Sequence, residues 1–378
     1  MKTILFISHS SSLTGGGEED FLKLLIYFHK KYNICTVFPP GGKSIEFIEN
    51  SDQYLEVKGT VFPFTKFRFK AYIGFFYRNF NKIFQIYNFI KKYGPFDLCF
   101  INSSVCFLEV LPVQIFKIPY ILSVKEKINP AIISKLIYFF YKKTALKILT
   151  ISKFLQAIII NQTGRKDVKV IYSTIDEKYF DRIKFDSNIK KQNQLNKKFR
   201  IVNIGSIFPN KGQHLLIEAL SLIDDNNIYI DYFGKIVDEK YYKNLNGLIK
   251  DNNISNRVSF KGEIKKEELI KEIINSDVVV ITSKEEGQSI VLLEGLYLEK
   301  PVITTKVGIA NEIIIDGENG LLYDYSDINK LSGLIVRLKK DKEFYNNIRL
   351  NCRSTYKRNF DSESGMKQYD DVFVECMK

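Results

Sequence analysis

Short apolar runs alternate with stretches of helical periodicity along most of the 378-residue chain. The runs that predict strands lie at 3–8, 33–38, 97–102, 119–124, 147–152 and 168–173, and then at 200–205, 228–234, 257–262, 277–282 and 301–305. Stretches that predict helices lie between them, for example at 18–32, 211–223, 239–252 and 266–276. Because nearly continuous apolar strands that alternate with helices are typical of parallel sheets covered on both faces, the pattern predicts an α/β fold.

One polar segment without helical period, at 181–198, interrupts this alternation, and we interpret it as a linker. The pattern on either side of it predicts two Rossmann-like domains that face each other, at 1–180 and 199–355. We expect a C-terminal helix at 356–378 to pack back on the first domain. Ligands of open parallel sheets bind beyond the carboxyl ends of the strands, so the predicted site is the cleft between the two domains.

The whole chain has a formal net charge of +13, and its excess of basic residues is concentrated in the first half. Residues 1–180 contain 25 Lys and Arg against 13 Asp and Glu, whereas residues 181–378 contain 31 against 30. This asymmetry favours an anionic partner of the first half, such as a membrane surface, nucleic acid or a phosphorylated acceptor. A basic surface that meets only solvent is the alternative.

The segment 58–92 carries much of this charge, with eight Lys and Arg, about a dozen aromatic residues and no Asp or Glu. Basic and aromatic residues that interleave on a helix suit an anionic membrane interface. They would also suit single-stranded nucleic acid, and a core helix with a solvated basic face is a third interpretation. We expect a membrane surface as the partner of this segment and no nucleic acid.

The start of the chain, "MKTILFISHSSS", has the pattern of a strand and lacks the cleavage site of a signal peptide. No run of 18 or more apolar residues predicts a transmembrane helix. The five cysteines show neither zinc spacing nor a disulfide framework. We therefore expect a cytoplasmic protein, peripheral at the inner face of the membrane if the basic segment binds there.

Two glycine-containing loops are candidates for anion binding. In "SLTGGGEED", Gly15, Gly16 and Gly17 precede a predicted helix, so their backbone amides can approach a ligand at the helix N-terminus. A plain glycine turn explains this loop equally well. In "GSIFPNKG", Lys211 can place an ammonium group beside a phosphate at the end of the strand 200–205, or it is a solvated surface lysine.

The stretch "SKEEGQSIVLLEG" follows the strand at 277–282 and opens a predicted helix. Glu286 precedes the first turn, and the backbone amides of Gly287, Gln288, Ser289 and Ile290 would be donors without a partner inside the helix. Glu294 stands eight positions after Glu286 among apolar neighbours, where an uncompensated carboxylate is costly. The two carboxylates can contact two parts of one extended ligand, or else Glu294 pairs with a lysine such as Lys300.

Taken together, these stretches resemble the retaining glycosyltransferases of family 4. The resemblance rests on "GSIFPNKG", "SKEEGQSIVLLEG" and "KPVITTKVGIANEIIIDGENGLLY", with the "GGGEED" loop and "VIYSTIDEKYF" in agreement. It implies the GT-B fold, with an acceptor-binding domain at 1–180 and a nucleotide-sugar-binding domain at 199–355. It also implies the Glu-x7-Glu motif of that family, in which Glu286 contacts the donor sugar and Glu294 holds the ribose.

Two positions depart from the family pattern. Ser206 stands where the family usually has an arginine beside the lysine that matches Lys211. Lys125 and Glu126 stand where the family often has a histidine after the strand 119–124. We expect Lys125 to supply a charge near the reaction centre and Glu126 to contact sugar or acceptor.

The sequence therefore predicts a retaining glycosyltransferase that moves a sugar from a nucleotide-diphosphate sugar to a glycan or lipid-linked acceptor, as in bacterial surface polysaccharide synthesis. The resemblance implies no obligatory metal or other cofactor. The predicted catalytic residues are Glu286, Lys211, Lys125 and Glu126. The predicted donor-binding residues are Gly15, Gly16, Gly17, Ser206, Lys211, Glu286, Gly287, Gln288, Ser289, Ile290 and Glu294. A sugar-nucleotide epimerase of the same fold, a catalytically inactive sugar-binding protein and a nucleic-acid-binding protein are the alternatives.

Overall fold

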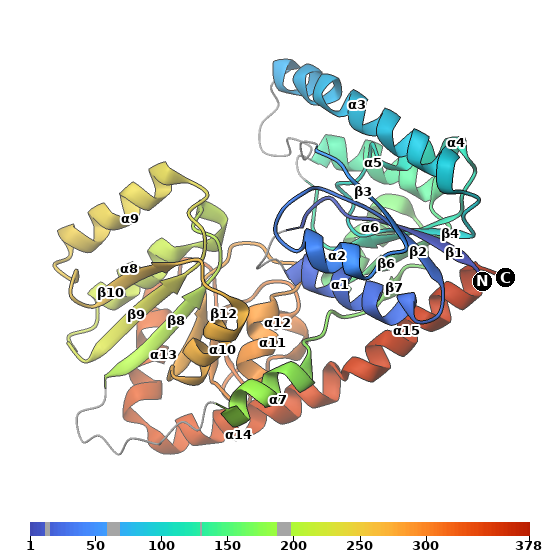
Figure 1. The fold of residues 1–378 in the computed structure, drawn as a ribbon. Coiled ribbons are helices and arrows are strands. Elements are labelled where there is room, and N and C mark those ends of the chain that lie inside the picture. Colours follow the sequence, from blue (N-terminus) through green and yellow to red (C-terminus); the bar gives the residue numbers. More distant parts are fainter. Residues whose placement is uncertain (12–15, 59–68, 129–130, 187–197) are drawn as a thin grey trace. The chain divides into compact units, whose positions relative to one another are not determined.

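The computed structural model describes residues 1–11, 16–58, 69–128, 131–186 and 198–378, and these form two compact units. Unit 1 consists of Met1–Ser173 and Glu363–Lys378, and unit 2 consists of Thr174–Ser362. Each unit has one parallel sheet with helices on both faces, so the predicted α/β class with parallel sheets is confirmed (Figure 1).

In its described residues, unit 1 has a seven-stranded sheet of order β3-β2-β1-β4-β5-β6-β7. The strands are β1 (Thr3–Ile7), β2 (Asn33–Phe38), β3 (Gln53–Glu56), β4 (Leu98–Ile101), β5 (Tyr120–Val124), β6 (Lys147–Thr150) and β7 (Lys169–Val170). The helices are α1 (Gly16–His29), α2 (Ser44–Glu49), α3 (Phe69–Tyr93), α4 (Val110–Ile115), α5 (Ala131–Thr144), α6 (Lys153–Thr163) and α15 (Ser362–Cys376).

Unit 2 has, among its described residues, a six-stranded parallel sheet of order β10-β9-β8-β11-β12-β13. Its strands are β8 (Phe199–Ile204), β9 (Ile228–Phe233), β10 (Val258–Gly262), β11 (Val278–Ile281), β12 (Val302–Thr305) and β13 (Leu321–Tyr323). Its α-helices are α7 (Glu177–Asp186), α8 (Gln213–Ser221), α9 (Glu239–Asp251), α10 (Lys266–Ile274), α11 (Ile290–Tyr297), α12 (Ala310–Ile313), α13 (Ile328–Lys340) and α14 (Lys342–Asn359), and a 3₁₀ turn lies at Pro209–Lys211.

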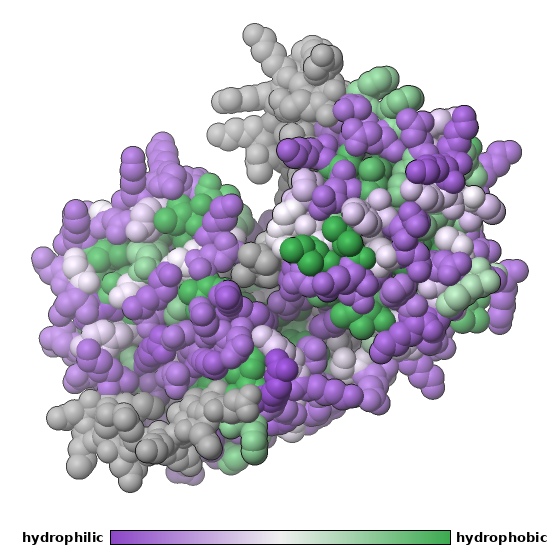
Figure 2. Space-filling view, in the orientation of Figure 1, coloured by the Kyte–Doolittle hydropathy of each residue, from purple (hydrophilic) through white to green (hydrophobic). Residues whose placement is uncertain are grey.

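Hydrophilic side chains cover most of the face seen in Figure 2, and apolar side chains are exposed in small groups between them. This distribution is ordinary for a folded domain, in which single exposed apolar residues need no explanation. A search of the described helices finds none with both the length and the apolar character needed to cross a membrane.

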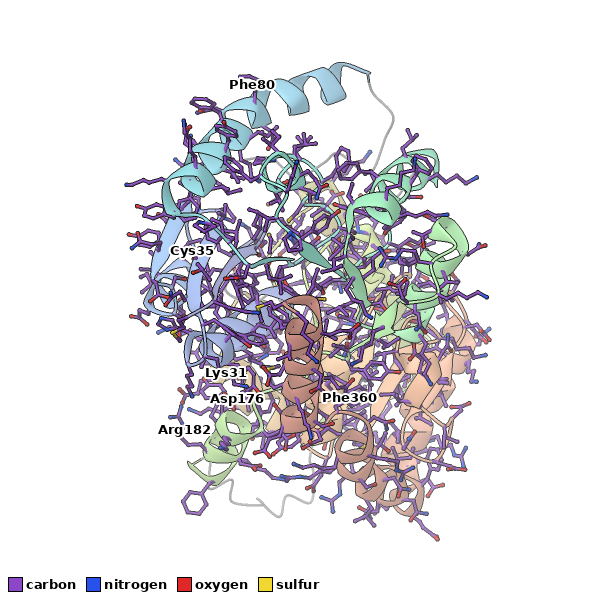
Figure 3. The ribbon with its side chains drawn as sticks, turned by 90° about the vertical axis from the view of Figure 1, so that its right-hand side faces the viewer. Lys31, Cys35, Phe80, Asp176, Arg182 and Phe360 are labelled. Atoms are coloured by element: carbon purple, nitrogen blue, oxygen red, sulfur yellow. The ribbon has the colours of Figure 1, made fainter. Side chains whose placement is uncertain are left out.

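The C-terminal helix α15 is part of unit 1, where it packs beside α1. The rings of Phe373 and Phe28 stack with their centroids 4.2 Å apart. The Lys31 ammonium lies 2.7 Å from the carboxylate of Asp370 near the surface (Figure 3). Of the helix expected over 356–378, residues 356–359 instead belong to α14, which is a helix of unit 2.

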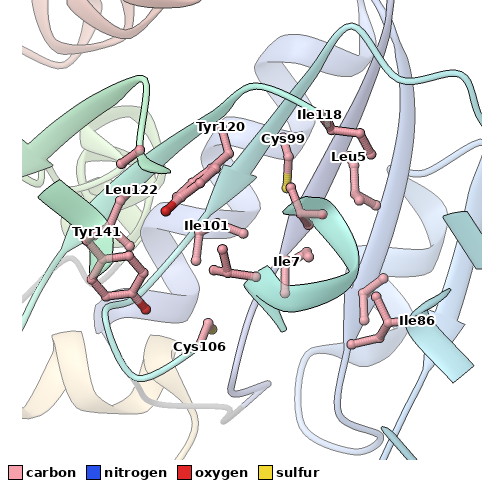
Figure 4. Packing of buried hydrophobic residues seen from close by; sticks show 14 of the residues in the cluster. Leu5, Ile7, Ile86, Cys99, Ile101, Cys106, Ile118, Tyr120, Leu122 and Tyr141 are labelled. Carbon is pink, nitrogen blue, oxygen red and sulfur yellow. The ribbon is translucent and has the colours of Figure 1, made fainter. Parts of the chain in front are cut away.

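The core of unit 1 lies in two layers, one on each face of its sheet. One layer contains Leu5, Ile7, Cys99, Ile101, Tyr120 and Leu122 from the strands, packed against residues of α3, α4, α5 and α6 (Figure 4). The other contains Ile4, Phe6, Phe100 and Ile121, packed against residues of α1, α2 and α15. Because strand residues alternate between the faces, the apolar strands predicted from the sequence supply both layers.

The linker expected over 181–198 begins inside a helix. Helix α7 occupies Glu177–Asp186 and belongs to unit 2, so the change of unit falls at residue 173 rather than at residue 180. Phe180 and Ile183 are buried, and the Phe180 ring packs edge-on against Tyr297 at 5.9 Å. These two apolar residues, three positions apart, form the buried face of the helix. The rest of the expected linker, 187–197, lies outside the described residues.

Candidate functional site

The loops that leave the carboxyl ends of β8, β11 and β12 lie in direct contact at one edge of the unit 2 sheet. Gly212 has φ of 63°, and a Cβ atom there would lie 2.2 Å from the carbonyl oxygen of Thr282. Gly308 has φ of 50°, and its Cβ would lie 2.5 Å from the carbonyl oxygens of Glu286 and Gly287. Only glycine fits such contacts without strain, so these positions allow three loops to meet.

Gly308→Ala is expected to reduce the free energy of unfolding by about 2–5 kcal/mol, because it adds a left-handed non-glycine residue and a clash with two carbonyl groups. Gly317→Ala is a matched control, since Gly317 also has positive φ, 84°, but has open space around it. The control should lose only about 1 kcal/mol. Urea unfolding of both variants measures the difference, and equal losses would contradict the contact between the loops.

This contact between loops brings Lys211 and Glu286 together, although they are 75 positions apart in the chain. The Lys211 ammonium donates a hydrogen bond to Oε1 of Glu286. The hydroxyl of Ser283 donates to the same oxygen at 2.7 Å. Both charged side chains are partly exposed, Lys211 by 26% and Glu286 by 15%, so a ligand can reach them. Two predicted catalytic residues are therefore in direct contact.

The position of Lys211 depends on the turn before α8. Lys211 ends the 3₁₀ turn rather than opening the helix predicted at 211–223, and α8 begins at Gln213. The hydroxyl of Thr282 donates to the Lys211 carbonyl at 2.6 Å, which anchors the turn to the loop after β11. The positive φ of Gly212 separates the turn from the helix, and this break directs Lys211 toward Glu286.

Ser206 lies beside this turn, and it is its backbone carbonyl that forms a hydrogen bond there. Its carbonyl oxygen accepts a hydrogen bond from Nε2 of Gln213 at 3.0 Å. Gln213 is fully buried, and its Oε1 accepts no hydrogen bond from any described residue. Gln213 was not among the predicted residues, because a glutamine at the start of a helix belongs to no motif with a defined spacing. It supports the loop that carries both Ser206 and Lys211.

His214, the second residue of α8, adds no further positive charge to this region. Burial lowers the pKa of its imidazole below the usual 6.5. Its Nδ1 lies 2.8 Å from the hydroxyl of Tyr241, whose own pKa is raised to about 12 by burial. The imidazole is therefore neutral at physiological pH, and Lys211 supplies the charge at this turn.

The residues Gly287, Gln288 and Ser289 form the loop before α11, and Ile290 is the first residue of that helix. Ser289 is the N-cap residue, and its side chain makes no capping hydrogen bond. The first amides of a helix have no partner within it, so the start of α11 suits an oxygen-rich ligand next to Glu286. The structure thus places all four predicted donor-binding residues directly after Glu286.

Glu294 lies in the middle of α11 and is 1% exposed. The ammonium of Lys266, the first residue of α10, donates a hydrogen bond to its Oε1. The alternative, that Glu294 pairs with a lysine, is therefore confirmed, but the lysine is Lys266. The Lys300 ammonium instead donates to the carbonyl oxygens of Ile274 and Ser276 at 2.6 and 2.7 Å. A buried carboxylate that meets a lysine from a neighbouring helix is compensated without a ligand.

In unit 1, the predicted residues gather at the carboxyl edge of β1, β4 and β5. Gly16 and Gly17 open α1, whereas Gly15 lies outside the described residues. The Lys125 ammonium donates to the Gly17 carbonyl at 3.2 Å and lies 3.5 Å from the carboxylate of Asp20. Asn102 also donates to the Gly17 carbonyl, at 3.3 Å. Lys125 therefore ties the glycine loop to the end of β5.

Glu126 accepts hydrogen bonds from two serine hydroxyls, Ser103 at 2.6 Å and Ser104 at 2.9 Å. Both bonds end on the same atom, Oε1 of Glu126. Asn102, Ser103, Ser104 and Asp20 were not among the predicted residues. The two serines could have been predicted from their position directly after the strand at 97–102, because side chains at the carboxyl end of a parallel strand lie at the ligand-binding edge.

A search for clusters of three or more His, Cys, Asp and Glu side chains able to hold a metal ion finds none in the described part of the chain. The sites in both units are instead built from lysine, glutamate, serine and backbone groups.

A family model described as glycosyl transferases group 1 matches residues 184–355, which contain Lys211, Glu286 and Glu294. Over 140 residues the chain is 35% identical to an uncharacterized glycosyltransferase, MJ1178, of Methanocaldococcus jannaschii, covering 37% of this chain and 38% of that protein. Over 250 residues it is 25% identical to the capsular polysaccharide biosynthesis glycosyltransferase CapM of Staphylococcus aureus, covering 62% and 63%. The alignments thus span from about a third to nearly two thirds of these relatives.

Among solved structures, the chain resembles Anabaena Alr3699/HepE in complex with UDP and glucose, with a TM-score of 0.81 and 20% identity. The superposition covers 99% of this chain and 100% of that one. At this identity the likeness concerns the fold, and it confirms the predicted GT-B architecture. Residues 184–355 thus match the glycosyl transferases group 1 model within a chain of GT-B fold.

Proposed function

We propose that this protein is a retaining glycosyltransferase of family 4 that uses a nucleotide-diphosphate sugar as donor. The contact between Lys211 and Glu286 carries the proposal, because it puts a cation and a carboxylate beside the N-terminus of α11. This combination suits a ligand with a phosphate next to hydroxyl groups. The match of the surrounding residues to the group 1 model supports the same activity.

The proposed acceptor is a glycan or a lipid-linked glycan of a bacterial surface polysaccharide. The relative CapM is named for capsular polysaccharide biosynthesis, which supports this choice. The HepE structures contain UDP, UDP with glucose, or UDP-glucose, so UDP and UDP-glucose are the first probes for the donor site. We propose that transfer to such an acceptor takes place in the cytoplasm, with the protein at the inner face of the membrane.

In this proposal each predicted residue of unit 2 has a separate role. Glu294 binds the ribose, and Glu286 binds hydroxyl groups of the donor sugar. Lys211 and the amides of Gly287, Gln288, Ser289 and Ile290 bind the diphosphate. Negative charge develops on the leaving diphosphate as its bond to the sugar breaks, and preorganised donors stabilise that charge most strongly in the transition state.

The bond-making step follows from retention of configuration. The acceptor oxygen attacks the anomeric carbon on the face from which the diphosphate leaves, and its proton passes to a leaving phosphate oxygen. Before the donor binds, Glu286 neutralises Lys211. A bound diphosphate would compete for the Lys211 ammonium, which releases Glu286 to contact the sugar.

In unit 1, Lys125 is proposed to supply a charge near the reaction centre and Glu126 to contact sugar or acceptor, while the glycine loop contacts the donor. Lys125 is held by Gly17 and Asp20, and Glu126 is held by two serines, so both side chains are fixed in place before any ligand arrives. The amides of Gly16 and Gly17 at the start of α1 suit an anionic group of the substrate.

Only part of the predicted membrane-binding segment, 58–92, lies within the described residues. Residues 59–68 lie outside the described part, and α3 covers 69–92. We propose an anionic membrane surface, and no nucleic acid, as the partner of this segment.

Transfer is expected to proceed in the presence of a chelator, because the proposed diphosphate contacts are a lysine and backbone amides. An α-linked donor is expected to give an α-linked product. Incubation of UDP-glucose with oligosaccharide acceptors, followed by product isolation and NMR of the new linkage, measures both outcomes. Activity that disappears in chelator and returns with a divalent ion would contradict the first expectation, and a β-linkage would contradict the second. Conversion of the donor to an isomeric sugar nucleotide without transfer would instead indicate an epimerase.

A further inference from the structure

The segments that follow β8 and β9 in unit 2 stay paired beyond the ends of these neighbouring strands (Figure 1). Within the strands the register ends on the pair Ile204 and Phe233, and a parallel bridge between Ile207 and Ile236 continues it. The N–H of Ile207 donates a hydrogen bond to the carbonyl oxygen of Lys235 at 2.8 Å. The two segments therefore keep one fixed register at the carboxyl edge of the sheet, where the proposed donor site lies.

Two glycines let these segments approach each other and the site. Gly234 has φ of 144°, and a Cβ atom there would lie 2.2 Å from the carbonyl oxygen of Gly205. Only glycine allows so close an approach of two backbones. A Cβ atom on Gly205 would in turn lie 3.5 Å from Cδ and Cε of Lys211. The aliphatic part of the Lys211 side chain thus lies against the same pair of segments.

The register places Lys235 directly opposite Ser206. The pairs on either side of this position, Ile204 with Phe233 and Ile207 with Ile236, have the same numerical offset. Opposite residues of neighbouring parallel strands project from the same face, with their backbones about 4.8 Å apart. The long side chain of Lys235 therefore starts beside Ser206, which itself supplies no charge to the loop that carries Lys211.

The charge of Lys235 is available to a ligand. Lys235 is exposed, and its side chain forms no hydrogen bond or ion pair with any residue that the structure describes. The Lys211 ammonium is instead bound to Glu286, and the Lys306 ammonium lies 3.0 Å from the carboxylate of Asp324. The pair of Lys211 and Glu286 has no net charge, whereas a nucleoside diphosphate carries more than one negative charge. A second cation would balance that charge.

We propose that Lys235 is this second cation and binds the diphosphate of the donor together with Lys211. The inference rests on the proposed nucleotide-diphosphate donor and adds a residue from the segment after β9. Because Lys235 has no carboxylate partner among the described residues, its charge attracts the incoming anion before Lys211 is released from Glu286. In the transition state it stabilises the negative charge that develops on the leaving diphosphate.

The first test measures nucleotide binding. The unaltered protein is titrated by calorimetry with UDP, GDP, ADP and dTDP, and the one that binds most tightly is used for the variants. Lys235→Met should weaken its binding about tenfold, the lower end of the range for a hydrogen bond to a charged group, because Lys235 is exposed. The matched control is Lys250→Met, which removes an exposed lysine from the last turn of α9 and should leave the affinity unchanged.

The second test restores the charge from the opposite segment. Ser206→Arg, added to Lys235→Met, should recover most of the lost affinity, whereas Ser206→Met adds a long side chain without charge and should recover none. Melting temperatures show whether each variant is folded. Unchanged affinity in Lys235→Met, or a loss that Ser206→Arg does not reverse, would overturn the inference and leave the proposed function standing. Failure of all four nucleoside diphosphates to bind the unaltered protein would overturn both.

Discussion

Lys211→Met is expected to lower the rate of sugar transfer by about 100- to 1,000-fold, the usual effect of removing one preorganised donor that stabilises developing negative charge. The expectation is strong because Ser206 supplies no cation in this loop, and the neighbouring His214 is neutral. Transfer from UDP-glucose under single-turnover conditions measures the effect. The melting temperature should change little, since Lys211 is partly exposed.

The matched control is Lys284→Met, which removes an exposed lysine from the loop after β11 and should retain transfer activity. Glu286→Gln provides the complementary result. It frees the Lys211 ammonium from its carboxylate partner, so UDP affinity should stay the same or rise while transfer falls. Near-normal transfer by Lys211→Met would show that the diphosphate binds elsewhere.

Glu294→Gln and Lys266→Met should separate the ligand-binding role of Glu294 from its structural role. If Glu294 binds the ribose, Glu294→Gln should weaken UDP binding about tenfold to a hundredfold, the cost of a lost hydrogen bond to a charged group. Lys266→Met should leave UDP affinity unchanged or raise it, because the carboxylate remains and loses a competing partner. Calorimetric titration with UDP measures both variants.

The same variants report on stability. Each should lower the free energy of unfolding by about 2 kcal/mol, because either change leaves half of a largely buried ion pair. For a cooperative unit of the size of unit 2, Thr174–Ser362, that lowers the melting temperature by about 4–8 °C. The double variant should recover part of the loss, since neither charge is then left alone. Equal UDP affinity in all four proteins would remove the ribose role and leave Glu294 as the partner of Lys266.

Local pattern was sufficient to predict the sheets and the position of most site residues. Apolar runs identified most of the strands, because a strand buried on both faces must be apolar almost throughout. Once the strands were placed, Lys211, Glu286 and Lys125 followed at their carboxyl ends, where open parallel sheets bind ligands. The apolar helix around Glu294 likewise indicated a buried carboxylate before any contact was known.

Contacts between distant residues required the folded chain. Glu294 meets Lys266 rather than Lys300 because α10 and α11 are neighbours in space, and the order of helices around a sheet is not encoded in local spacing. Lys211 meets Glu286 because glycines allow the loops to close, and α7 joins unit 2 through two buried apolar residues in a polar segment.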